Sequence, residues 1–129
     1  MTLFNEGRWD EWQAELTSDS AMEDMSVGSK AIGSDEVVAY VQGRKTMFPD
    51  LVGTCDNRND AGDGLVEECS WTGTNTGNIV TPDGNTIQPT GKSVNLRNLM
   101  IWEYQDGKVK SVKNYLDMMT MMSQLGLVG

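Results

Sequence analysis

The chain has 129 residues, 38% hydrophobic and 22% charged, which is typical of one soluble globular domain, here residues 1–129, large enough for a real core. Its 19 acidic against 10 basic residues give a net charge of −9, which would repel a phosphate backbone and argues against a nucleic-acid partner. No stretch has the roughly 18 apolar residues of a membrane span. The N-terminus has neither the basic nor the apolar region of a signal peptide, so a cytoplasmic location without a membrane partner is expected.

Two helices are predicted in the first 50 residues. Residues 5–25 are expected to form the first, because apolar side chains recur at helical spacing from Trp9 to Leu16 and two methionines continue the stripe. The second begins after Ser34, a favourable N-cap residue, and ends at Pro49.

After residue 50 the apolar pattern alternates, which predicts strands. Four are expected, over residues 51–58, 65–76, 93–104 and 109–116. A Gly- and Pro-rich stretch separates the second from the third, and a last helix begins at Asp117 and ends near Leu125. Helices, a strand meander and a closing helix predict an α+β domain: a curved antiparallel sheet with helices on one face and a pocket at the open end.

The two cysteines lie on either side of a predicted hairpin turn. If that turn centres on Gly62, Cys55 and Cys69 face each other, and a disulfide is geometrically conceivable. In a cytoplasmic chain we expect free, buried thiols instead. Two cysteines without any histidine are too few for a structural zinc site, so no metal is expected.

Asp117 is the leading candidate for a catalytic group. Without histidine, proton transfer near neutral pH falls to a tuned carboxylate or to a Cys, Tyr or Lys side chain. Asp117 lies where a strand passes into a Met-rich helix, and two interpretations stay open. As the N-cap of that helix it would have a lowered pKa, whereas in an apolar cavity desolvation would raise its pKa.

Polar and aromatic residues on apolar faces are the candidates for a pocket wall. Asn98 and Asn114 lie on mostly apolar strand faces, as pocket-lining hydrogen-bonding groups or as satisfied edge residues. Tyr40, Trp71 and Trp102 are interpreted as core residues or as surfaces on which a ligand stacks. The methionines of the last helix fit either a core with a dimer contact or an adaptable pocket wall.

Several segments of the chain resemble one known family in order and spacing, over about residues 4–126. They are Met47-Phe48-Pro49-Asp50-Leu51, Trp71-Thr72-Gly73-Thr74-Asn75-Thr76-Gly77, Pro89-Thr90-Gly91-Lys92, Ile101-Trp102-Glu103-Tyr104-Gln105-Asp106-Gly107-Lys108-Val109, Asn114-Tyr115-Leu116-Asp117 and Ser123-Gln124-Leu125-Gly126. Together they resemble the SnoaL-like polyketide cyclases, which belong to the superfamily named for nuclear transport factor 2.

The resemblance implies a cone-shaped α+β fold, with a curved sheet wrapped around the N-terminal helices and a deep pocket, commonly dimerised through the sheet. It implies a metal-free and cofactor-free intramolecular aldol ring closure, with Asp117 as general acid/base and polar pocket residues holding the enolate oxygen. The family's common Gly-Thr-His-Thr-Gly pattern has Asn75 at the histidine here, and Lys113 replaces a common Trp. Asn75 can donate a hydrogen bond but cannot shuttle a proton at neutral pH.

The resulting prediction is a polyketide-cyclase-like protein that binds a mainly apolar or aromatic small molecule, as a homodimer, with no cofactor. If active, it would be a cyclase, isomerase or hydrolase using the carboxylate of Asp117. The alternatives are a non-catalytic small-molecule-binding protein and a dimeric scaffold of the same fold. The predicted ligand contacts are Tyr40, Trp71, Asn75, Asn98, Trp102 and Asn114.

Overall fold

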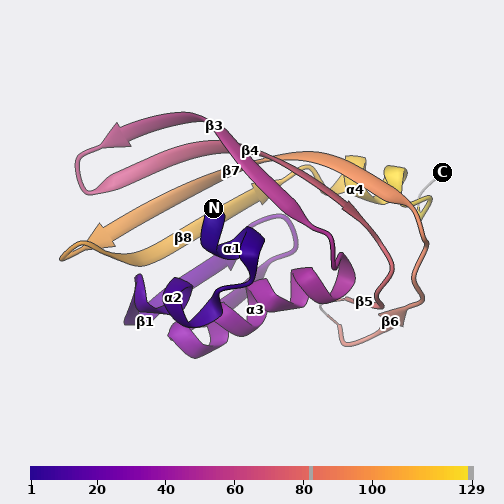
Figure 1. Cartoon of the computed structure of the whole chain (residues 1–129), viewed down its shortest axis with the longest axis horizontal. Coiled ribbons are helices and arrows are strands. Elements are labelled where there is room, and N and C mark those ends of the chain that lie inside the picture. Colours follow the sequence, from indigo (N-terminus) through magenta and orange to yellow (C-terminus); the bar gives the residue numbers. More distant parts are fainter. Residues whose placement is uncertain (82, 128–129) are drawn as a thin grey trace.

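A six-stranded sheet arches over three helices in the computed structural model, which describes residues 1–81 and 83–127 (Figure 1). The strand order is β2-β1-β8-β7-β4-β3, and every neighbouring pair is antiparallel except β1 and β8. The sheet strands are β1 (Leu16–Asp24), β2 (Ser29–Ile32), β3 (Val52–Ala61), β4 (Gly64–Thr74), β7 (Ser93–Gln105) and β8 (Lys108–Leu116). The predicted α+β class with a mainly antiparallel sheet is confirmed.

The remaining elements lie under the arch and at one of its ends (Figure 1). Helices α1 (Thr2–Glu6), α2 (Trp9–Ala14) and α3 (Ser34–Met47) lie on the concave side of the sheet, whereas α4 (Met118–Gln124) follows β8 (Figure 1). The short strands β5 (Ile79–Val80) and β6 (Thr86–Ile87) form a separate hairpin. Within the described residues, no helix has the length and apolar character needed to cross a membrane.

The predicted first helix is wrong beyond residue 14. Gly7 adopts a left-handed conformation that ends α1, and the next helix ends before Leu16. From Leu16 onward the chain is a strand, on which Ser20, Met22 and Asp24 are buried at every second position. That period of two suits a strand paired on both edges, here with β2 and β8. The second helix agrees with its prediction, except that Gly33 is its N-cap and Ser34 its first residue.

The four predicted strands of the meander are found within a few residues of their expected bounds. Their alternation directs one set of apolar side chains onto the concave face, where they pack against α3. The buried set includes Trp71, Val94, Leu96 and Met100 from the sheet and Val37, Val38 and Val41 from the helix. In the last two strands of the meander, the mostly apolar faces that carry Asn98 and Asn114 are the buried faces.

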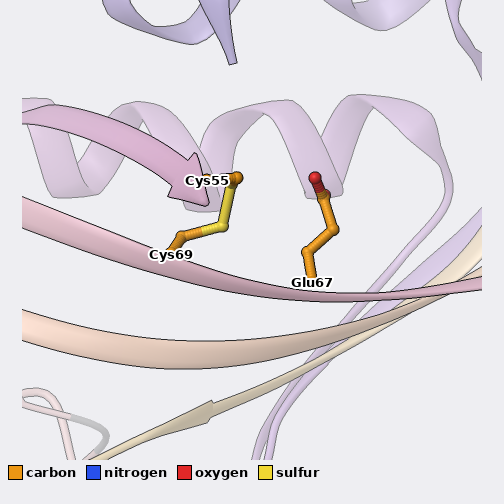
Figure 2. A group of neighbouring side chains, drawn as sticks. All are labelled: Cys55, Glu67 and Cys69. Atoms are coloured by element: carbon orange, nitrogen blue, oxygen red, sulfur yellow. A yellow bond between two sulfur atoms is a disulfide. The ribbon is translucent and has the colours of Figure 1, made fainter. Parts of the chain in front are cut away.

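Cys55 and Cys69 are joined by a disulfide, so the expectation of free thiols is wrong (Figure 2). The two residues are directly paired across β3 and β4, which brings their β-carbons within reach of a bond. Cys69 is fully buried and Cys55 half-buried. Because disulfides are typical of oxidising compartments, the cytoplasmic location stays a prediction.

Opening this disulfide should lower the free energy of unfolding by about 3 kcal/mol, the value expected for a cross-link with a sequence separation of 14. Urea unfolding of the oxidised and reduced protein measures the difference. The Cys55→Ala variant is the control, since its stability should not respond to reductant. Coincident unfolding curves for the oxidised and reduced wild type would contradict the prediction.

Candidate functional site

A pocket of about 620 Å³ lies between α3, the inner face of β4, β7 and β8, and α4. Most of its wall is apolar, and Met47, Leu96, Met118, Met121 and Met122 all contribute to it. The hairpin of β5 and β6 adds Ile79, Val80 and Ile87. The expectation that methionines of the last helix form part of a pocket wall agrees with this lining, although Met119 points away and is 70% exposed.

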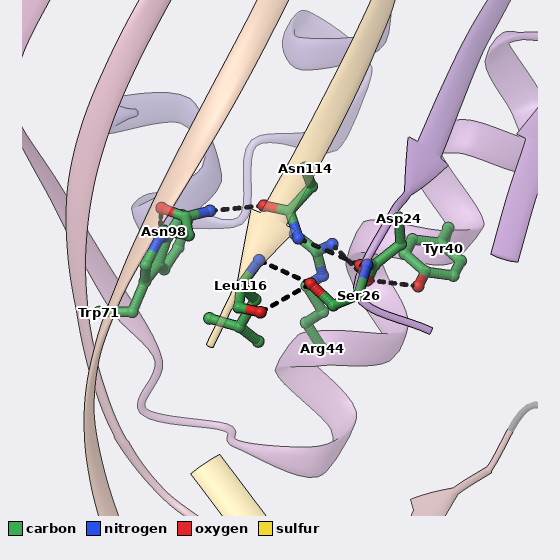
Figure 3. A network of polar contacts seen from close by, with 8 residues as sticks. All are labelled: Asp24, Ser26, Tyr40, Arg44, Trp71, Asn98, Asn114 and Leu116. Carbon is green, nitrogen blue, oxygen red and sulfur yellow. Dashed lines mark hydrogen bonds and ion pairs between the residues drawn. The ribbon is translucent and has the colours of Figure 1, made fainter. Parts of the chain in front are cut away.

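Asp24 supplies the only carboxylate in the described wall of this pocket. It ends β1 on the concave face and is 7% exposed. Four donors converge on it (Figure 3). Oδ2 accepts from the hydroxyl of Tyr40 at 2.8 Å and from Nη2 of Arg44 at 3.4 Å. Oδ1 accepts from the backbone N–H of Ser26 at 3.2 Å and from Nδ2 of Asn114 at 3.4 Å. A buried carboxylate is thus retained through an ion pair and hydrogen bonds.

Tyr40 and Arg44 reach Asp24 from α3 because residues four apart share one face of a helix. The guanidinium carbon of Arg44 lies 5.3 Å from the centre of the Tyr40 ring. Burial of the phenol, followed by its hydrogen bond to the Asp24 carboxylate, raises the pKa of Tyr40 above its ordinary value. The phenol therefore keeps its proton at neutral pH, as a donor to Asp24 or to a ligand.

The two asparagines that stood out on apolar strand faces are hydrogen-bonded to each other. Nδ2 of Asn98 donates to Oδ1 of Asn114 at 2.6 Å, and Nε1 of Trp71 donates to Oδ1 of Asn98 at 2.8 Å. Both asparagines line the pocket and are buried. Neither is an edge residue, and together they connect Trp71 to Asp24.

Four of the six predicted ligand contacts, Tyr40, Trp71, Asn98 and Asn114, meet in this pocket wall. Trp102 does not belong to it. Its side chain is half-buried and packs against the core, with its indole Nε1 buried and without a hydrogen-bond partner among the described residues. Trp102 therefore interacts with the protein's own side chains in this structure, and the predicted ligand contact is corrected.

Asn75 is also absent from the pocket wall, and its hydrogen bonds are internal. Nδ2 donates to the carbonyl oxygens of Met47 at 3.0 Å and Gly77 at 2.9 Å. Oδ1 accepts from the backbone N–H of Thr90 at 2.8 Å and from its hydroxyl at 3.0 Å. The residue is fully buried. Asn75 thus joins the two ends of the segment that carries β5 and β6 to the end of α3, instead of the predicted contact with a ligand.

Asp117 is the N-cap of α4, is exposed and does not line the pocket. Oδ1 accepts from the backbone N–H of Thr120 at 3.0 Å, and Oδ2 accepts from the Thr120 hydroxyl at 2.6 Å. These two hydrogen bonds hold the pKa of Asp117 below its ordinary value. Of the two open interpretations, the structure supports the helix cap.

The Asp117→Ala variant should be less stable than wild type at neutral pH, and the difference should shrink in acid. The pKa of Asp117 is lower in the folded state than in the unfolded state, where it is about 3.9. The carboxylate therefore stabilises the fold at pH values above about 3.9, and this stabilisation is lost as the pH falls through the pKa of the folded state. Urea unfolding between neutral pH and about pH 2 measures it. Thr120→Val, which removes the stronger of the two bonds, should reproduce part of the effect. A difference that does not depend on pH would exclude this account.

Asp24, Ser26 and Arg44 are the site residues that sequence reasoning missed. Asp24 carried a usable signal, because it continues the alternation of Ser20 and Met22 and so falls on the buried phase of a strand. Interpreting that segment as helix concealed the pattern. Arg44 shares a helix face with Tyr40 and was detectable by spacing alone.

Outside the pocket, one cluster in the described residues has side chains of the kind that bind metals. Single ligand atoms of Cys55, Glu67 and Cys69 lie within 4.8 Å of one another (Figure 2). Both sulfurs belong to the disulfide and are not thiolates, the form in which cysteine binds a metal. In this oxidised state the cluster is a poor fit for a metal ion.

The chain matches the family model of the SnoaL-like polyketide cyclases over residues 1–125. No curated protein matches it. Among solved structures, a protein from Jannaschia sp. CCS1 described as a SnoaL-like polyketide cyclase, without an established activity, has a TM-score of 0.83 at 20% identity, covering 98% of this chain and 88% of that one. TsrD from Streptomyces laurentii has a TM-score of 0.82 at 21% identity, with coverage of 98% and 88%.

A third similar structure comes from Catenulispora acidiphila and is described as having a ketosteroid isomerase-like fold. Its TM-score is 0.79 at 14% identity, covering 96% of this chain and 86% of that one. At these identities the structural matches show the shared fold alone.

Proposed function

Since the chain belongs to the SnoaL-like polyketide cyclase family, we propose that its pocket binds a mainly apolar small molecule and that Asp24 moves a proton on it. The observation that carries this proposal is a buried carboxylate facing an apolar pocket, with a phenol and a guanidinium beside it. Asp24 takes the role that the sequence assigned to Asp117, because Asp24 is the carboxylate that the ligand would meet.

The chemistry that suits this geometry is enolisation followed by ring closure. A carbon beside a ligand carbonyl gives its proton to a carboxylate oxygen of Asp24, and the C–H electron pair forms an enolate. Arg44 spends one of its five N–H donors on Asp24 in the contacts described, so others remain for the enolate oxygen. The enolate carbon then attacks a second carbonyl of the same molecule, and the resulting alkoxide takes the proton back from Asp24.

A second candidate is a non-catalytic binding protein with the same pocket. The observation that favours it is that both oxygens of Asp24 already accept two hydrogen bonds each. A carboxylate occupied in this way has to release a donor before it accepts a proton.

Deuterium exchange distinguishes the two candidates. Naphthoylacetone, an aryl diketone with an enolisable carbon, is incubated with the protein in D₂O. Its binding is followed by quenching of the tryptophan fluorescence, to which Trp71 in the pocket wall contributes. An enzyme accelerates exchange at that carbon above the buffer rate, whereas a binding protein quenches without acceleration. Absence of both effects would count against any ligand of this class.

We also propose a homodimer formed through the outer face of the sheet. Leu99 is directly paired with Tyr115, and Val66 with Ile101, at positions whose side chains point away from the pocket. Tyr115 is 40% exposed. Helices α1, α2 and α3 all lie on the opposite side (Figure 1). These apolar side chains alternate with the charged Lys113 and Glu68, which are paired with Ile101 and Leu99. A second copy that presents the same mixed surface could cover the apolar groups and pair the charges.

Light scattering should give twice the chain mass of 14.2 kDa for the wild type and the mass of one chain for Ile101→Lys. The lysine would place an unpaired charge in the contact. A wild type that remains monomeric at micromolar concentration would contradict the dimer without affecting the pocket.

A further inference from the structure

We propose that the indole N–H of Trp71 is a positioning group, which sets the direction of a hydrogen-bond chain through Asn98 and Asn114 and so fixes the Asp24 carboxylate. This hydrogen-bond chain consists of three hydrogen bonds (Figure 3). Trp71 donates to Asn98 at 2.8 Å, Asn98 donates to Asn114 at 2.6 Å, and Asn114 donates to Asp24 at 3.4 Å. The proposal rests on the proposed role of Asp24 as the proton acceptor.

The direction of the chain follows from the chemistry of its first member. An asparagine side chain can turn either its oxygen or its nitrogen to a neighbour, but an indole N–H only donates. Trp71 therefore requires the oxygen of Asn98, which leaves the nitrogen of Asn98 facing Asn114. The same reasoning turns the oxygen of Asn114 to Asn98 and its nitrogen to Asp24. Reversing either amide would bring two donors face to face.

Burial makes this order strict. Trp71, Asn98 and Asn114 are 8%, 7% and 2% exposed, so a reversed amide would have little access to solvent as a substitute partner. The carboxylate at the end only accepts, as the indole at the start only donates. Both ends of the chain therefore demand the same direction.

The two oxygens of Asp24 consequently differ. Oδ1 is held by Asn114 on β8 and by the backbone N–H of Ser26, whose hydroxyl is in turn bonded to the backbone of Leu116. Oδ2 meets the phenol of Tyr40 and the guanidinium of Arg44, two long side chains of α3 that can turn to a ligand. The hydrogen-bond chain thus helps to fix Oδ1 from the sheet, whereas Oδ2 exchanges a proton with the ligand once Tyr40, its closest donor at 2.8 Å, turns from it to the ligand.

Trp102 offers a matched control. Its indole lies on the neighbouring strand β7, and its N–H has no hydrogen-bond partner among the described residues. Trp71→Phe removes the N–H that starts the hydrogen-bond chain, whereas Trp102→Phe removes one that has no partner in the described part of the protein. Both changes keep an aromatic ring in the core.

The experiment measures two quantities in each variant: the NMR signals of the Asp24 carboxyl carbon and of the Asn98 and Asn114 side-chain amides, and the exchange of naphthoylacetone across its concentration range. Trp71→Phe should shift all three sets of signals. It should also lower the exchange rate at saturation about tenfold, with less than about a threefold change in half-saturation, because a misplaced base affects the reacting step more than binding. Trp102→Phe should change neither quantity.

The proposal is overturned if Trp71→Phe leaves the Asp24 signal and the saturating rate at wild-type values, or if Trp102→Phe produces equal changes. Asn98→Leu removes the hydrogen bond from Asn98 to Asn114 and should shift the Asp24 signal in the same way. This variant tests the proposal if the Trp71→Phe protein does not fold. If the wild type does not accelerate deuterium exchange of naphthoylacetone above the buffer rate, the proposed function fails. The NMR signals then still decide whether the hydrogen-bond chain positions Asp24.

Discussion

Asp24→Asn should lower protein-catalysed deuterium exchange of naphthoylacetone by at least about 100-fold, the range typical of a lost general base. An amide cannot take up the proton that a carboxylate accepts. Its NH₂ group would also face donors that now converge on Asp24, since all four of its described contacts are donors. Exchange rates at saturating diketone, with the buffer rate subtracted, measure the loss.

Asp117→Asn is the matched control, because it makes the same chemical change at an exposed helix cap. It should retain the wild-type exchange rate, and Asn is itself a good N-cap residue. Circular dichroism and thermal melting establish that both variants are folded. The assignment to Asp24 would be wrong if Asp24→Asn retained full exchange, or if Asp117→Asn lost it while remaining folded.

Asn75→Ala should lower the free energy of unfolding by about 3–5 kcal/mol, a large part of the 5–15 kcal/mol typical of a single domain. The change removes four side-chain hydrogen bonds at a fully buried position. It leaves the backbone groups of Met47, Gly77 and Thr90 without those partners. Urea unfolding followed by fluorescence measures the loss.

Asn57→Ala is the control for Asn75, since its single side-chain bond to Glu68 is exposed and should contribute less than about 0.5 kcal/mol. Gly77→Ala tests the same junction from the backbone, because a β-carbon there would collide with the carbonyl oxygen of Thr46. It should be strongly destabilising as well. Equal stabilities for Asn57→Ala and Asn75→Ala would refute the structural role of Asn75.

The pocket residues show what a single sequence can and cannot predict. Asn98, Asn114, Trp71 and Tyr40 were identified because polar or aromatic side chains on an apolar face call for an explanation, and all four line the pocket. Trp102 was identified by the same reasoning as Trp71 and Tyr40, and Asn75 by the family resemblance, yet neither lines the pocket. Their placement depends on which loop or strand lies opposite, and no local pattern encodes that.

Asp24 lines the pocket and Asp117 does not, for a related reason. Both are acids beside a Met residue near the end of an element. Only the pairing of β1 with β8 directs Asp24 into the cavity, whereas the start of α4 engages Asp117 as its cap. The cysteines were likewise correctly placed opposite each other by the hairpin, although their bond was not expected.

Local pattern was sufficient for the α+β class, for α3 and for the hairpin strands, because a helix closes its own hydrogen bonds and a tight hairpin pairs with its neighbour in the chain. Long-range pairing was required for β1, whose parallel partner β8 lies about 90 residues further along. The same pairing brings Asp24 beside Asn114, and the packing of α3 adds Tyr40. The candidate site therefore depends on contacts that no window of the sequence contains.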